Sequence, residues 1–205
     1  MSQHGQPLVV EFAGSAVSAR DFPRDGLPEA ALVGRSNVGK SSLINKLTGA
    51  HRVAAVSRTP GRTQSINFFR VFSRIGGRFY LVDLPGYGYA RVPQQIRGKW
   101  EAMVSGYLFD RAALRLAFLV VDVRHEPQPG DLAARSLLVE RGIPLQVIYT
   151  KWDKLSRADR ARQRTRLGQV YGAAGSLPPI PFSAVTGEGR KELWSAIERH
   201  VLGAK

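Results

Sequence analysis

The residues with the most specific chemical signature form the stretch GRSNVGKS, Gly34 to Ser41. It fits the spacing G-x-x-x-x-G-K-[ST], in which two glycines let backbone N–H groups turn toward phosphates, at the favourable N-terminus of a helix. Lys40 is then placed to reach the β and γ phosphates of a nucleotide, and the Ser41 hydroxyl to bind Mg²⁺. A loop that merely turns the chain is the alternative, but strand, loop and helix follow in the required order. The predicted phosphate-binding residues are Gly34, Arg35, Ser36, Asn37, Val38, Gly39, Lys40 and Ser41.

A second candidate, Asp83, closes an apolar strand and begins the stretch DLPG. It is placed to hold Mg²⁺ through a water, whereas Gly86 can bring its N–H to a γ-phosphate only if its loop moves. The segment is therefore predicted to be a switch, although D-x-x-G alone is a weak signal because an aspartate at a strand end is usually a turn residue. The predicted switch residues are Asp83, Leu84, Pro85 and Gly86.

Tyr87 follows this glycine, at the position where many P-loop hydrolases have a glutamine that orients the attacking water. Tyrosine has no amide to do this, so no catalytic side chain is assigned. We expect the water to be oriented by backbone, by a partner or by a second cation, and we expect slow unaided hydrolysis. We also expect Tyr87 to lie exposed in a mobile switch.

The stretch TKWD ends a later strand and predicts the nucleotide base. The Asp153 carboxylate can accept hydrogen bonds from N1–H and the 2-amino group of guanine, a donor pair that adenine lacks. The Lys151 stem would cover the base, and the Ala184 N–H would bind the guanine O6. An ATPase or small-molecule kinase is therefore disfavoured. The predicted base-binding residues are Thr150, Lys151, Trp152, Asp153, Phe182, Ser183 and Ala184.

The stretch SRTPGRTQS lies between the first predicted helix and the second predicted strand. A threonine here could complete the Mg²⁺ ligands, with Thr63 the first choice and Thr59 the second, although a plain Pro-Gly turn is an alternative. The predicted metal ligands are thus Ser41 and Thr63. The nucleotide-binding residues predicted in this loop are Gly61, Arg62, Thr63, Gln64 and Ser65.

Apolar runs that alternate with helical stretches must position these residues. Strands are predicted at 30–33, 65–72, 78–83, 114–122, 145–150 and 179–183, and helices at 40–48, 94–109, 129–141, 156–171 and 188–202. Ser156 and Asp159 predict a helix cap, and Gly76-Gly77 predicts a hairpin. The pattern indicates an α/β fold with a mostly parallel six-stranded sheet and helices on both faces. We expect an N-terminal arm over 1–28 and a single domain over 29–205.

The composition sets limits on the function. The chain has 205 residues and no cysteine, which excludes disulfides and thiolate metal sites. Its longest clean apolar run, 116–121, is too short to span a membrane, and the N-terminus does not resemble a signal peptide. We therefore expect a cytoplasmic protein without membrane contact. Thirty Lys and Arg against sixteen Asp and Glu give a net charge of +14, which favours a nucleic-acid or ribonucleoprotein partner over a merely solvated basic surface.

The stretches GRSNVGKSSLIN, PGRTQSINFF, DLPGYGYA and TKWD, in this order, resemble the EngB family of bacterial ribosome-assembly GTPases. The resemblance covers about residues 8 to 202. It implies a Ras-like P-loop GTPase fold, GTP or GDP with Mg²⁺, and a role in assembly of the large ribosomal subunit, with a link to cell division and septum formation. Thr150 stands where the wider superfamily prefers asparagine, a change that the family shares. Asn37 matches a potassium ligand of related GTPases, or is an asparagine that tolerates an awkward backbone angle.

Two groups of basic residues are candidate contacts with ribosomal RNA and proteins. The stretch KLSRADRARQRTR, Lys154 to Arg166, is predicted to form a general RNA-facing surface. The second group flanks the switches and is the better candidate for nucleotide-dependent contact: Arg52, Arg58, Arg62, Arg91, Arg97 and Lys99. Two functions remain open, a GTPase switch on an assembling ribosomal particle and an RNA-binding module that GTP merely stabilises. We expect a monomer.

Overall fold

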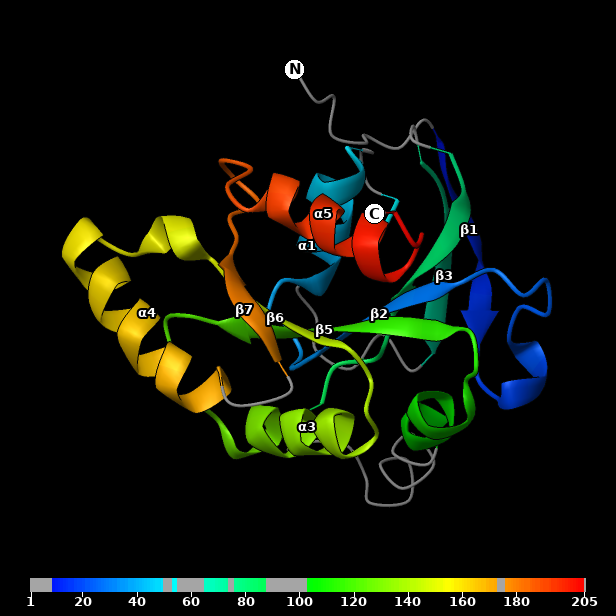
Figure 1. Cartoon of the computed structure of the whole chain (residues 1–205), viewed down its shortest axis with the longest axis horizontal. Helices are drawn as coiled ribbons and strands as arrows, with labels where there is room; N and C mark the ends of the chain where they lie inside the picture. Colours follow the sequence, from blue (N-terminus) through cyan, green and yellow to red (C-terminus); the bar gives the residue numbers. More distant parts are fainter. Residues whose placement is uncertain are drawn as a thin grey trace.

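The computed structural model describes residues 9–49, 53–54, 65–73, 76–87, 103–172 and 176–204. In these ranges, one sheet is covered by helices on both faces (Figure 1). The strands are β1 (Val9–Ala16), β2 (Glu29–Gly34), β3 (Ile66–Phe72), β4 (Arg78–Asp83), β5 (Leu114–Asp122), β6 (Leu145–Thr150) and β7 (Ser176–Pro181). The helices are α1 (Lys40–Thr48), α3 (Pro129–Glu140), α4 (Arg157–Tyr171), α5 (Arg190–His200), a helical segment over 103–110, and the 3₁₀ turns η1 (Ala19–Asp21) and η2 (Trp152–Lys154).

The strand order places the ends of β2, β4, β5 and β6 at one edge of the sheet. The described strands lie in the order β1-β3-β4-β2-β5-β6-β7. β2 pairs in parallel with β4 and β5, and β6 pairs in parallel with β5 and β7. β3 is antiparallel to β1 and β4. Because the central strands are parallel, their carboxyl ends, which carry the predicted site residues, lie together.

The described part of the chain contributes seven strands to the sheet, so the predicted count of six is wrong. The additional strand, β1, lies within residues 1–28 and pairs with β3 from Val9↔Phe72 to Ala16↔Ile66. Five of its eight side chains are exposed, and among the described strands β1 has a neighbour, β3, on one side only. Such an edge strand needs no continuous apolar run. A shift of register between Phe12 and Gly14 also interrupts the alternation of side chains along β1. Its sequence therefore carries little strand signal.

Most other predicted elements agree with the structure. β4, β5, β6 and α1 have the predicted bounds, and the described part of the second predicted helix covers 103–110. The Ser156 hydroxyl caps α4 by accepting a hydrogen bond from the Asp159 N–H at 3.2 Å. β7 begins three residues earlier than predicted and includes Pro178 and Pro179. Prolines are tolerated there because β7 is an edge strand, which pairs only with β6 among the described strands.

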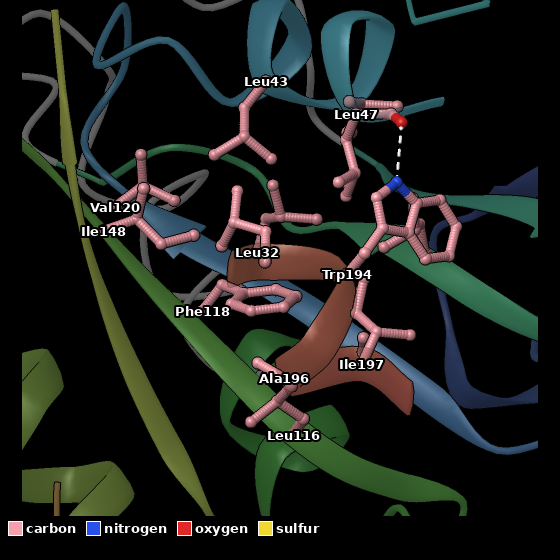
Figure 2. Packing of buried hydrophobic residues seen from close by; sticks show 14 of the residues in the cluster. Leu32, Leu43, Leu47, Leu116, Phe118, Val120, Ile148, Trp194, Ala196 and Ile197 are labelled. Carbon is pink, nitrogen blue, oxygen red and sulfur yellow. Dashed lines mark hydrogen bonds between the residues drawn. The ribbon is translucent and has the colours of Figure 1, made fainter. Parts of the chain in front are cut away.

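The central strands are buried on both faces, which explains their continuous apolar sequences. On one face, α1 and α5 pack over β2, β5 and β6, and Figure 2 shows Leu43, Leu47 and Trp194 around Leu32 and Phe118. There the Trp194 indole N–H donates to the Leu47 carbonyl at 3.1 Å. On the other face, the segment 103–110, α3 and α4 cover the sheet. The strand ends are therefore held on a rigid support.

No helix within the described ranges combines the length and the apolar character that crossing a membrane would require.

Candidate functional site

The loop between β2 and α1 has the backbone shape that its sequence predicts. Asn37 and Gly39 both adopt left-handed backbone conformations, with φ of 61° and 111°. Asparagine tolerates this region better than most residues, which accounts for Asn37 without a bound ion. Its role as a potassium ligand stays a prediction. Lys40, the first residue of α1, is buried, and its Nζ lies 3.3 Å from the Gly34 carbonyl oxygen.

Lys40, Ser41 and Asp83 come together where α1 begins and β4 ends. The Ser41 Oγ lies 3.5 Å from the Asp83 Oδ2, and the other oxygen, Oδ1, is buried with no hydrogen-bond partner among the described residues. Burial raises the pKa of Asp83, while Lys40 and then the Ser41 hydroxyl oppose this change. Burial likewise lowers the pKa of Lys40 against the effect of Asp83. Each group is the main charge compensation of the other.

These residues fit a magnesium ion. A buried carboxylate oxygen without a partner next to a serine hydroxyl is a suitable place for a hard cation. Within the described ranges no cluster of three or more His, Cys, Asp or Glu could bind a metal. Mg²⁺ does not need one, because it commonly takes one or two protein oxygens and completes its ligands with phosphates and waters. When bound, it would neutralise phosphate charge.

Thr150 connects β6 to the loop before α1. Its hydroxyl donates to the Val38 carbonyl at 2.7 Å and lies 3.1 Å from the Val121 carbonyl oxygen. The short Thr150 side chain is therefore long enough to connect the base-binding motif to the phosphate-binding loop. Lys151 makes a second connection, because its Nζ donates to the Asn37 carbonyl at 3.0 Å.

Asp153 is held in place by Ser183 from the loop after β7. The Ser183 hydroxyl donates to the Asp153 Oδ1 at 2.7 Å and accepts from the Thr186 N–H at 3.1 Å. The Asp153 side chain keeps 13% exposure, and its second oxygen, Oδ2, lies 3.6 Å from the Lys154 Nζ. The Ser183 hydrogen bond lowers the pKa of Asp153 against a smaller opposing effect of burial, and Lys154 lowers it further. The carboxylate is thus ionised and oriented at neutral pH.

Several other predicted residues form the supports of this site. Trp152 and Phe182 are buried, and the backbone N–H of Trp152 donates to the Phe182 carbonyl at 3.2 Å. The Leu84 N–H donates to the Leu32 carbonyl at 3.2 Å, which continues the pairing of β4 with β2 beyond the strand. Ser65 directly precedes β3, and its hydroxyl lies 3.3 Å from the Asn67 Oδ1.

Some sequence predictions fall outside the described residues. They are Gly61, Arg62, Thr63 and Gln64, the alternative Thr59, and the basic residues Arg52, Arg58, Arg91, Arg97 and Lys99. The predicted pairing of Ser41 with Thr63 at the metal therefore stays a prediction.

Tyr87 differs from its prediction. It is half-buried rather than exposed, and its hydroxyl donates to the Asp131 Oδ1 at 2.7 Å. Its carbonyl accepts a hydrogen bond from the Ser36 N–H at 3.2 Å. The Tyr87 side chain packs against α3. No local sequence pattern indicates this contact, because Tyr87 and Asp131 are 44 positions apart.

Asp122, at the end of β5, is a site residue that the sequence motifs do not predict. It accepts hydrogen bonds from the Lys151 Nζ at 2.7 Å and from the Arg124 guanidinium at 2.8 Å. Burial pushes the pKa of Asp122 up, but these hydrogen bonds outweigh it and bring the pKa down to about 2. An aspartate that ends the strand next to TKWD was the available signal. Asp122 orients the Lys151 side chain that is expected to cover the base.

Comparison with known proteins agrees with this arrangement. The family described as 50S ribosome-binding GTPase matches residues 29–151. The probable GTP-binding protein EngB of Symbiobacterium thermophilum is 42% identical over 221 residues, which cover 93% of this chain and 95% of that protein. Its counterpart in Solibacter usitatus is 45% identical over 190 residues, which cover 93% and 95%. A crystal structure of a probable GTP-binding protein engB has a TM-score of 0.66 and 25% identity, and the match covers 85% of this chain and 99% of that one. The chain therefore belongs to the EngB family of P-loop GTPases.

Proposed function

We propose that the site binds GTP with its guanine at Asp153 and its phosphates at the loop between β2 and α1. One observation carries this proposal: the ionised Asp153 is fixed by Ser183, while the adjacent Lys151 is bonded to the Asn37 carbonyl of the loop. Base recognition and phosphate binding thus belong to one connected structure. A carboxylate in this place accepts two hydrogen bonds from guanine, whereas adenine would leave it unpaired.

We further propose that Lys40 binds the β and γ phosphates and that Mg²⁺ is held by Ser41 and Thr63, with Asp83 acting through a water. The contact of Ser41 with Asp83 and the unpaired Asp83 Oδ1 support this assignment for two of the three residues. Hydrolysis to GDP and phosphate would then depend on positioning and charge compensation, which are the main contributions of proteins to phosphoryl transfer.

We also propose a cellular role in assembly of the large ribosomal subunit in the cytoplasm, with normal cell division and septum formation depending on it. The net charge of +14 and the ribosome named in the family description support this role. On α4, Arg157, Arg162 and Arg164 are exposed, and Arg160 and Arg164 lie over the Trp152 ring at 5.8 Å from its centroid. This basic face lies next to the base-binding residues and could contact ribosomal RNA.

Ser183→Ala tests the base-binding part of the proposal. Without the hydroxyl, Asp153 loses the hydrogen bond that orients it, so GTP and GDP should both bind about 10- to 150-fold more weakly, in line with one hydrogen bond to a charged group. Affinities of both nucleotides from fluorescence titration would check this. Thr186→Ala is the matched control, because its hydroxyl accepts from the exposed Glu188 N–H in the same loop. An unchanged affinity in Ser183→Ala would contradict the proposed role of Asp153.

An RNA-binding module that GTP stabilises, with negligible hydrolysis, is the second candidate. It is favoured by the Tyr87 hydroxyl, which is engaged with Asp131 and is not free to orient a water. Multiple-turnover phosphate release, with and without large ribosomal subunits, separates the two functions. We expect slow release that the particles stimulate, and binding to the particles that weakens between about 50 and 200 mM salt. A rate that stays at background in the presence of particles would favour the module.

A further inference from the structure

The Tyr87 side chain packs closely against the first turn of α3. Its hydroxyl bonds to Asp131, which is 3% exposed and lies in the first turn of α3. Its ring lies over Gly130, where an added Cβ would be 3.1 Å from the Cδ2 and 3.2 Å from the Cε2 of the tyrosine. These distances are shorter than ordinary van der Waals contact. Hence, any larger residue at position 130 would press on the ring.

The backbone of the same segment is packed against the phosphate-binding loop. The Tyr87 carbonyl accepts from the Ser36 N–H at 3.2 Å. An added Cβ at Gly86 would lie 2.5 Å from the Ser36 nitrogen and 2.9 Å from the Arg35 carbonyl carbon, so only glycine allows this approach. Gly86 therefore lies directly on the loop, between the anchored Tyr87 and Asp83 at the metal end.

We propose that Tyr87 and Asp131 form a latch that positions Gly86 beside the γ-phosphate, and so raises the preference of the site for GTP over GDP. The inference rests on the proposed function. Tyr87 is thus a positioning residue: in place of a glutamine that orients water, it holds the DLPG segment against the loop through α3. A segment that is already ordered loses less conformational entropy when it binds a third phosphate.

The charges around the latch agree with this role. Burial, and after it Asp131, raises the pKa of Tyr87, so the phenol keeps its proton and remains a donor. Burial raises the pKa of Asp131, and the Tyr87 hydrogen bond and then Arg35 offset only part of this rise. Arg35 belongs to the phosphate-binding loop. The latch is therefore connected to that loop twice, by the charge of Arg35 and by the hydrogen bond from the Ser36 N–H to the Tyr87 carbonyl.

A double-mutant cycle tests the latch. Tyr87→Phe and Asp131→Ala should each lower the ratio of GTP to GDP affinity by on the order of tenfold, the scale of one hydrogen bond to a charged group. The double variant should be no worse than either single one, because both changes remove the same bond. Asp131→Asn retains an acceptor oxygen and should recover part of the loss. In steady-state hydrolysis, KM for GTP should rise in Tyr87→Phe while kcat stays within a few-fold.

Two further variants separate the latch from a general effect on folding. Tyr149→Phe removes another buried phenolic hydroxyl, one without a hydrogen-bond partner among the described residues, and should leave the affinity ratio unchanged. Gly130→Ala should lower the ratio in the normal chain but not in a Tyr87→Ala background, where no ring remains to be displaced. An unchanged ratio in Tyr87→Phe would overturn the proposal, and so would a raised one, which would mean that the latch keeps Gly86 away from the phosphate. Failure of the unmodified protein to bind GTP would instead refute the proposed function.

Discussion

Asp153→Asn is expected to weaken GTP binding by about 2–4 kcal/mol, the scale for a buried charge-assisted hydrogen bond that is replaced by a mispaired one. Ser183 already occupies one carboxylate oxygen at 2.7 Å, so the orientation of the group is fixed before guanine arrives. An asparagine amide would present an N–H toward the guanine donors, and this like-to-like contact leaves buried groups unsatisfied. Xanthine nucleotides carry a 2-oxo group in place of the amino group, so their affinity for Asp153→Asn should rise.

Competition between GTP, ATP and xanthosine triphosphate for a fluorescent nucleotide would measure this exchange of specificity. Asp110→Asn is the matched control, because Asp110 is an exposed carboxylate at the end of the helical segment 103–110. It should leave all three affinities unchanged. Equal binding of ATP and GTP by the unmodified protein would refute the guanine assignment as a whole. A loss of GTP affinity without a gain for the xanthine nucleotide would show that Asp153 does not contact the hydrogen-bonding edge of the base.

The predictable part of the fold is the part that the core requires. β4, β5 and β6 are continuous apolar runs because they are buried between two layers of helices, and their bounds follow from the sequence. β1 could not be found in this way, since five of its eight side chains face solvent. Its formation depends on backbone pairing with β3, some fifty residues later in the chain. Edge strands of this kind are specified by tertiary context rather than by periodicity.

In the candidate site, too, the sequence predicts the residues of local motifs but not their long-range partners. Local motifs place Lys40, Ser41 and Asp83 at one strand edge. The structure brings the Ser41 hydroxyl to 3.5 Å from Asp83 and places Lys40 where its charge acts on that carboxylate. What the motifs do not contain are the partners that orient these groups. Ser183 reaches Asp153 across 30 positions, and Asp131 reaches Tyr87 across 44. A single sequence gives no signal for such pairs, because each joins two segments far apart in the chain whose relative positions only the folded sheet determines.

Lys40→Ala should remove useful affinity for nucleoside triphosphate, with a loss of about 2–5 kcal/mol, the scale for deleting one member of a buried charge pair. The lysine is 8% exposed, and its Nζ lies between the loop carbonyls of Gly34 and Arg35 at 3.3 and 3.5 Å. Its removal leaves both the phosphate charge and the Asp83 carboxylate without their nearest cation. GTP should suffer more than GDP, because the γ-phosphate adds charge that Lys40 would balance.

The same variant has a second, independent consequence for stability. Burial already raises the pKa of Asp83, and Lys40 is the first opposing influence, so its loss should raise that pKa further. A carboxyl whose folded pKa lies above its unfolded value of about 4 stabilises the fold below that pH and loses this contribution as the pH rises through the folded pKa. Thermal unfolding of Lys40→Ala should therefore show a larger deficit at pH 8 than at pH 5, and Lys191→Ala, an exposed lysine of α5, should show neither effect. A pH-independent deficit together with unchanged GTP affinity would show that Lys40 neither compensates Asp83 nor binds phosphate.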